Sequence, residues 1–248
     1  MKKLIIVVLA LMLPGWAASE SLKDIRWMSE QYPPYNYVDD NGTPKGVTFD
    51  VLFKMFEKIG YKLPKGDVEF LPWARSYRTL QSDPHTALFS MTYTPEREKL
   101  FQFVGPIIPS KIGVIAKKSR GLSVASADDL NGLTIGAIRD DIGHQMLQSQ
   151  GVKDGSIHLM SNTRNMLKML QRDRVDAVAY GNDIALWNLK QMGADTSEYE
   201  VVYILKDGKM GYAFHKDTDP ALLKKLQAAL DQLKADGSVE SISNQYLK

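Results

Sequence analysis

Cysteine is absent from this 248-residue chain, so neither a disulfide nor a thiol nucleophile nor a cysteine-based metal site can form within it. An exported bacterial protein with a lipid anchor would also need a cysteine just after its cleavage site, and we expect no such anchor. The four histidines are scattered, and no two have the spacing of a His-x-x-x-His or His-Glu-x-x-His zinc motif. We therefore expect no metal, no cofactor and no catalytic group of these kinds.

An excess of charge of one sign is also missing. The formal net charge is +2, and Lys2 and Lys3 account for it, because setting them aside leaves 29 of the 31 basic residues against 29 acidic ones. This balance gives no electrostatic reason to propose nucleic acid or an anionic membrane as a partner.

One long hydrophobic run is present, Leu4–Leu13, directly after the two lysines. Pro14-Gly15 interrupts it, and small residues follow at 17–19. The run is too short to cross ~30 Å of hydrocarbon, which argues against a transmembrane anchor. A positive start, an apolar run and small residues are the order of a secretory signal peptide. We therefore predict a signal peptide at residues 1–19 and a periplasmic location.

Beyond residue 20, segments patterned like buried strands alternate with segments of helical periodicity. Strands are predicted at 24–28, 68–71, 87–91, 112–116, 134–138, 175–179 and 201–205. Helices are predicted at 48–59, 73–80, 126–130, 142–150, 165–170, 184–192 and 220–235, with another starting at Thr94-Pro95-Glu96 and a short terminal one ending at Tyr246. This alternation predicts two series of parallel βαβ units and hence two α/β lobes.

No Ser/Gly-rich linker marks the boundary between the two series. We expect short extended hinges near Ser110 and near Asp207-Gly208. Lobe 1 is accordingly assigned to residues 20–110 and 213–248, and lobe 2 to residues 111–212.

Six stretches in a fixed order carry a resemblance to a known family. They are Tyr32-Pro33-Pro34-Tyr35, Gly46-Val47-Thr48-Phe49-Asp50, Thr94-Pro95-Glu96-Arg97 with Phe103, Asp129-Leu130-Asn131-Gly132 before Gly136, Arg174-Val175-Asp176-Ala177-Val178, and Leu233-Lys234-Ala235-Asp236-Gly237-Ser238. With them the chain resembles the extracellular solute-binding proteins, family 3, of ABC importers, over essentially its whole length after the signal peptide. The resemblance implies a two-lobed, type II periplasmic-binding-protein-like α/β fold. Each lobe would be a mostly parallel sheet flanked by helices, with the ligand cleft between the lobes.

The same resemblance implies a monomeric, non-enzymatic periplasmic protein. It would capture a small polar solute, typically an amino acid or related carboxylate, and deliver it to the membrane permease of an ABC importer. Two alternatives stay open. Some relatives on this fold are dehydratases for prephenate-like substrates, and Asp141 or Asp183 would then serve as the acid. The other alternative is a sensor that presents its closed form to a separate membrane receptor.

In the family, the arginine of the Thr-Pro-Glu-Arg helix start holds the ligand carboxylate through a two-pronged salt bridge, and the resemblance gives that role to Arg97. We expect Arg97 to lie outside the core; its alternative is a surface pair with a neighbouring glutamate. Ser90 and Thr92 match ligand-contacting positions just before it. Tyr32 and Trp73 match the two aromatic residues that enclose the ligand side chain, although either could instead be a core residue.

Lobe 2 departs from the family pattern. Amino-acid receptors carry an aspartate for the α-ammonium group where this chain has Gly181, and Asp183 could replace it or cap the helix that begins there. The loop after Gly136 reads Arg139-Asp140-Asp141, and its acidic pair would repel a carboxylate and favour a cation. Asp141 is therefore a further candidate ligand contact. An amino acid is expected as ligand, with extra positive charge or a different solute class left open.

Overall fold

The computed structural model describes residues 21–247, and the predicted signal peptide lies outside this range. The helices are α1 Val47–Lys58, α2 Trp73–Ser82, α3 Pro95–Leu100, α4 Ile142–Ser149, α5 Thr163–Gln171, α6 Asn182–Gln191, α7 Pro220–Ala235 and α8 Ser238–Leu247. The strands are β1 Arg26–Ser29, β2 Tyr37–Val38, β3 Pro44–Lys45, β4 Glu69–Phe70, β5 Thr86–Thr92, β6 Phe101–Lys117, β7 Ile135–Ile138, β8 Ile157–Met160, β9 Ala177–Gly181 and β10 Tyr199–His215. The helix expected at 126–130 is a 3₁₀ helix, Ala127–Gly132. Within residues 21–247, no helix combines the length and the apolar character needed to cross a membrane.

The predicted helices form where apolar residues recur on one face. In α7, Leu222, Leu226, Leu230 and Leu233 line up along the helix and are buried, while the Asp219 side chain accepts a hydrogen bond from the backbone of its first turn. Between the helices, β5 is buried along its entire length, as expected of a central strand covered on both faces.

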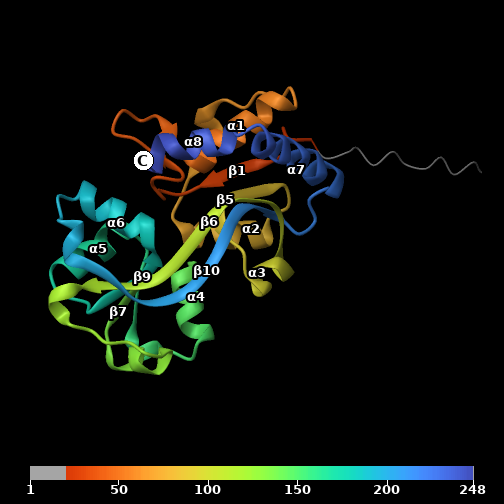
Figure 1. The fold of residues 1–248 in the computed structure, drawn as a ribbon. Helices are drawn as coiled ribbons and strands as arrows, with labels where there is room; N and C mark the ends of the chain where they lie inside the picture. The colour runs from red at the N-terminus through yellow and green to blue at the C-terminus, as the bar shows by residue number, and fades with distance from the viewer. Residues whose placement is uncertain (1–20, 248) are drawn as a thin grey trace, which may run out of the picture.

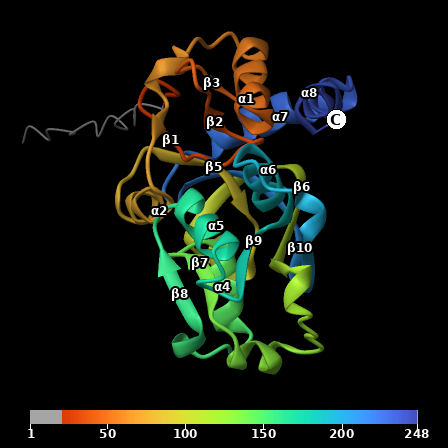
Figure 2. The same cartoon turned by 90° about the vertical axis from the view of Figure 1, so that its left-hand side faces the viewer.

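The main sheet has eight strands in the order β4-β1-β5-β10-β6-β9-β7-β8. Strand β1 pairs in parallel with β4 and β5, and β7 pairs in parallel with β8 and β9. The pairs made by β10 with β5 and β6, and by β6 with β9, are antiparallel. Figure 1 and Figure 2 show two bodies: one with α1, α7 and α8 around β1 and β5, the other with α4, α5 and α6 around β7 and β9. We call them the first and second lobes.

Strands β6 and β10 join the two lobes and are much longer than the sequence predicted. Each spans 17 residues, whereas the predicted strands cover only 112–116 and 201–205. Their middle sections contain proline, serine, lysine and glycine, which are not typical of a β-strand. These sections are nevertheless extended, because the two strands hydrogen-bond to each other there, with Ser110 opposite Gly208. The proposed lobe boundaries, between 110 and 111 and between 212 and 213, both fall inside these strands.

The core of the first lobe centres on Trp27, which is 1% exposed. Its indole meets the rings of Phe56, Phe89 and Phe214 edge-on, with centroids 5.1, 6.2 and 5.7 Å away. In the second lobe the side chains of β9 alternate between two apolar layers, as the pleat of a strand requires. One of these layers belongs to the same apolar cluster as Trp27, so the packed interior continues from the first lobe into the second.

Candidate functional site

Arg97 is placed by the helix start that the sequence predicts. Thr94 caps α3, its Oγ1 accepting a hydrogen bond from the Arg97 backbone N–H at 3.2 Å, and Pro95 occupies the first helical position. Helix α3 follows closely on β5, so Arg97 lies beyond the carboxyl end of a central strand. In α/β sheets this is the edge where ligands bind.

The Arg97 side chain is 1% exposed, so the expectation that it lies outside the core is wrong. Its guanidinium carbon lies 5.3 Å from the ring centroid of Trp73 and 5.5 Å from that of Tyr77. Nε donates to Oε1 of Gln145 at 3.0 Å, and Nη1 donates to the backbone carbonyl of Thr92 at 3.1 Å. Nη2 has no hydrogen-bond partner among the described residues. A buried, charged hydrogen-bond donor therefore lacks an acceptor.

Asp141 enters the same region from the second lobe. It occupies the N-cap position of α4 and is 4% exposed, and its Oδ2 lacks a hydrogen-bond partner within the described chain. Burial raises the pKa of Asp141 to about 6, while Arg97 and the backbone amides of Ile142 and Gly143 act in the opposite direction. Burial also lowers the pKa of Arg97, against the influence of Asp141. An unpaired donor and an unpaired acceptor thus lie in one desolvated region.

Glu30 belongs to the same cluster. It follows β1 directly, and it lines a cavity between the lobes. Burial raises the pKa of Glu30 well above its ordinary value, the charge of Asp141 adds to the rise, and Arg97 opposes it. The cluster therefore contains two carboxyl groups from opposite lobes and one guanidinium.

The cavity beside this cluster has a volume of about 800 Å³. Its walls include Glu30, Tyr37 and Trp73 of the first lobe and Arg164 and Trp187 of the second. The rings of Tyr37 and Trp187 approach each other to 5.6 Å between centroids and so connect the two lobes. Trp73 contributes both to the cavity wall and to the contact with the guanidinium of the cluster, which makes the two regions continuous.

Tyr32 lies at the lobe interface and is 3% exposed. Its ring meets Tyr180 edge-on at 5.6 Å between centroids. A Cβ atom built at Gly181 would lie 2.8 Å from the Tyr32 hydroxyl. The Cδ1 atom of Ile184 would be closer still. The hydroxyl and the Ile184 side chain together occupy the space into which a side chain at position 181 would extend, so glycine suits this position here.

Asp183 lies apart from the cluster. It is exposed in the first turn of α6, whose N-cap is Gly181 and not Asp183. The Tyr35 hydroxyl donates to Asp183 Oδ2 at 3.2 Å from the other lobe. Within the described chain Asp183 makes no hydrogen bond or ion pair with Arg97 or Asp141. Its position is at the rim of the cleft.

Ser90 and Thr92 direct their hydroxyl groups into the first lobe. Ser90 Oγ is hydrogen-bonded to Asn36 Oδ1 and lies 2.8 Å from Thr48 Oγ1, and its φ of 53° places it in the left-handed region. Thr92 Oγ1 lies 3.1 Å from Ser110 Oγ on the connecting strand β6. Thr92 touches the cluster through its carbonyl oxygen and not through its hydroxyl.

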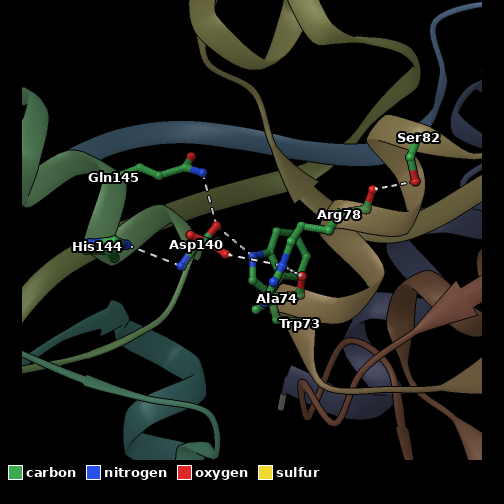
Figure 3. Close-up of polar contacts among 7 residues, drawn as sticks. All are labelled: Trp73, Ala74, Arg78, Ser82, Asp140, His144 and Gln145. Atoms are coloured by element: carbon green, nitrogen blue, oxygen red, sulfur yellow. Dashed lines mark hydrogen bonds and ion pairs between the residues drawn. The ribbon is translucent and has the colours of Figure 1, made fainter.

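A second contact between the lobes centres on the backbone carbonyl of Asp140. Trp73 Nε1 donates to this oxygen at 2.8 Å, and Gln145 Nε2 donates to it at 3.0 Å (Figure 3). Arg78, one turn and a half further along α2, has its Nε 4.0 Å from Asp140 Oδ2. Asp140 has a φ of 61°, and its N–H donates to His144 Nδ1 at 3.2 Å. A tight turn thus presents its carbonyl oxygen to the opposite lobe.

The structure brings together four of the residues proposed from the sequence, namely Tyr32, Trp73, Arg97 and Asp141. Sequence reasoning missed Tyr77 and Gln145. Each could have been found by helical spacing, because Tyr77 lies four residues after Trp73 and Gln145 four residues after Asp141, on the same helix faces. Among residues 21–247, no group of three or more His, Asp or Glu side chains is close enough to hold a metal ion.

The chain is similar to known proteins over its whole described length. The family model for bacterial extracellular solute-binding proteins, family 3, matches residues 25–248. The chain is 29% identical over 252 residues to ABC transporter arginine-binding protein 1 of Escherichia coli (strain K12), with 99% of each covered. It is 26% identical over 238 residues to the arginine-binding extracellular protein ArtP of Bacillus subtilis (strain 168), covering 93% of this chain and 89% of that protein. Its fold is similar to that of an ancestral arginine-binding protein bound to arginine, with a TM-score of 0.78, 25% identity, and 92% of this chain and 100% of the other covered.

Proposed function

Because the chain belongs to the bacterial extracellular solute-binding proteins of family 3, we propose that it captures an amino acid of net positive charge between its lobes and passes it to the permease of an ABC importer. Periplasmic solute binding is the function of the family. The choice of amino acid, the permease and a monomeric state are our proposals. So is export through the signal peptide at residues 1–19, which N-terminal sequencing of the mature protein tests.

One observation carries this proposal: the free Nη2 of Arg97 and the free Oδ2 of Asp141 lie in one buried region. A buried donor or acceptor without a partner costs about 1–3 kcal/mol, and more when it is charged. A ligand carboxylate satisfies the guanidinium, and a ligand ammonium or guanidinium satisfies the carboxylate. An amino acid carries both of these groups, a carboxylate and an ammonium, on one small molecule.

The charge of the cluster supports a ligand with an extra positive group. Burial favours the protonated form of Glu30 in the free protein, as its raised pKa indicates, and a ligand cation beside Glu30 would favour the ionised form. With both carboxyl groups ionised, Glu30 and Asp141 together outweigh Arg97 by one negative charge. A ligand with one carboxylate and two cationic groups balances this excess, whereas a neutral zwitterion leaves one carboxyl group protonated or unpaired. The relatives whose names specify arginine agree with this charge count.

Tyr32 and Trp73 supply the apolar walls. Both are nearly inaccessible, and both lie against charged members of the cluster, so they exclude water from it. Exclusion of water strengthens each ionic contact that the ligand makes. We propose no chemical step at this site, and prephenate, the substrate of the alternative dehydratase function, is expected to remain unchanged on incubation.

The test is calorimetry on ligand-stripped protein with three probes. L-Arginine has one carboxylate and two cationic groups, L-citrulline has the same shape without the side-chain charge, and agmatine lacks the carboxylate. We expect arginine to bind at least tenfold more tightly than either of the other two. At 100 times its dissociation constant it should add ~2.7 kcal/mol to the free energy of unfolding. Equal affinities for arginine and citrulline would contradict the charge argument, and failure of all three to bind, together with conversion of prephenate, would favour the enzyme.

A further inference from the structure

We propose that Gln145 is a positioning residue that fastens the two lobes together at the ligand site and orients the guanidinium of Arg97. The fastening role rests on hydrogen bonds seen in the structure. Only the consequence for ligand binding rests on the proposed function.

Both ends of the Gln145 amide have hydrogen-bond partners. Its Oε1 accepts from Arg97 Nε at 3.0 Å across the lobe interface, and its Nε2 donates to Asp140 O at 3.0 Å within its own lobe. The reverse orientation of the amide would place an NH₂ group against the guanidinium and an oxygen against a carbonyl. Arg97 and the Asp140 carbonyl therefore determine the orientation of the Gln145 amide, with its oxygen toward Arg97 and its nitrogen toward Asp140.

These contacts are part of a closed ring of four residues. Arg97 bonds to Gln145, Gln145 to Asp140 O, and Asp140 O to the indole N–H of Trp73 at 2.8 Å. Trp73 in turn lies against the guanidinium of Arg97, 5.3 Å from ring centroid to Cζ. Two members come from the first lobe and two from the second, and Figure 3 shows the second-lobe pair facing α2. Because every member has two neighbours, loss of one loosens the others.

This ring determines which part of Arg97 is available. A carboxylate can engage an arginine side-on through Nε and one Nη, or end-on through both Nη atoms. Gln145 holds Nε, and the carbonyl of Thr92 takes one hydrogen of Nη1. The side-on approach is closed, so the expected two-pronged contact is end-on and includes the free Nη2.

The ring also steadies the turn that carries Asp141. Asp140 has a φ of 61°, an uncommon value for a residue other than glycine. Its carbonyl oxygen accepts hydrogen bonds from Trp73 Nε1 and Gln145 Nε2. Asp141 follows immediately and begins α4. Gln145 therefore acts on both charges of the site, on Arg97 directly and on Asp141 through the turn.

The main experiment needs no ligand. Because the chain has no cysteine, Lys62→Cys and Lys153→Cys, two exposed positions in opposite lobes, give a unique dye pair for single-molecule energy transfer. We expect a closed fraction in the ligand-stripped protein, and a closed-to-open ratio about tenfold lower in Gln145→Met, which keeps the length and removes both hydrogen bonds. The matched control is Gln148→Met, one turn later on α4 and exposed, which should leave the ratio unchanged.

A second variant separates orientation from fastening. Gln145→Glu can still accept from Arg97 but cannot donate to Asp140 O, and its carboxylate competes with a ligand carboxylate for the guanidinium. With L-arginine as probe, we expect Gln145→Glu to weaken binding at least thirtyfold and Gln145→Met about tenfold.

The outcomes are distinct. A wild-type protein with no closed fraction, or an unchanged closed fraction in Gln145→Met, overturns the fastening role. Unchanged arginine affinity in folded Gln145→Glu overturns the orienting role. If arginine does not bind the wild type at all, the proposed function fails, while the ligand-free measurement still decides whether Gln145 fastens the lobes.

Discussion

Replacement of Asp141 by asparagine tests the physical account of the cleft most directly. The substitution keeps the shape of the side chain and removes its ability to ionise. In the structure Asp141 is 4% exposed and its pKa is raised to about 6 from the ordinary 3.8, chiefly by burial. The ionised form is therefore less stable in the folded protein than in water. At 1.36 kcal/mol per pH unit, the difference between 6 and 3.8 amounts to about 3 kcal/mol.

The sign of the pH dependence follows from the two pKa values. Below about pH 3.8 the carboxyl group is protonated in both the folded and the unfolded chain, and wild type and Asp141→Asn should differ least. Between pH 3.8 and about 6 the unfolded chain loses the proton while the folded one keeps it, so the wild type loses stability relative to the variant. Above about pH 6 both have ionised, and the difference levels off at its full value.

The assay is thermal unfolding of ligand-stripped wild type and variant from pH 3.5 to 8. At pH 7.5 we expect the variant to be more stable by about 3 kcal/mol, which is about 6–12 °C in Tm at 2–4 °C per kcal/mol for a chain of this size. With L-arginine the order should reverse in affinity, the variant binding at least tenfold more weakly because it cannot pair with a cation. A Tm difference that is constant across this pH range would show that water reaches Asp141 in the free protein, and the burial argument would fail.

Three further substitutions have defined outcomes. Arg97→Lys should weaken arginine binding about tenfold by calorimetry, because lysine keeps the charge and lacks the planar pair of donors; equal affinity would place the ligand carboxylate elsewhere. Asp183→Asn should change the affinity less than about threefold, since an exposed carboxylate is screened by solvent; a larger loss would move the cation site to the rim. Gly143→Ala should lower the free energy of unfolding by about 2 kcal/mol or more, because its Cβ would collide with the β9 backbone, whereas Gly132→Ala, with open space around it, should not.

Much of the fold could be read from the sequence because its signals are local. The leucines of α7 repeat at helical spacing, and Thr94-Pro95 marks the beginning of α3, so periodicity and cap chemistry place these elements to within a residue or two. Buried strands such as β5 appear as short apolar runs. The alternation of such segments was enough to indicate two α/β lobes, and the family match agrees with that interpretation.

The long strands β6 and β10 could not be read in this way. Their middle residues are polar or are breakers of regular structure, and they are extended because the two strands pair with each other, Ser110 opposite Gly208. Such pairing joins positions almost 100 residues apart, and no local pattern reports it.

At the site, residue type and position along the chain were enough to select Arg97, Tyr32, Trp73 and Asp141 as candidates. Their environment came only from tertiary structure. Arg97 is buried, and the pKa of Asp141 is raised, only when the two lobes close on each other, because desolvation depends on every atom nearby and not on the chain neighbours. The same closure brings the polar atoms that lack hydrogen-bond partners, Arg97 Nη2 and Asp141 Oδ2, into one region. Gln145 illustrates the same limit: its sequence neighbours say that it lies on a helix, and only the packing of α4 against the other lobe gives it Arg97 as a partner.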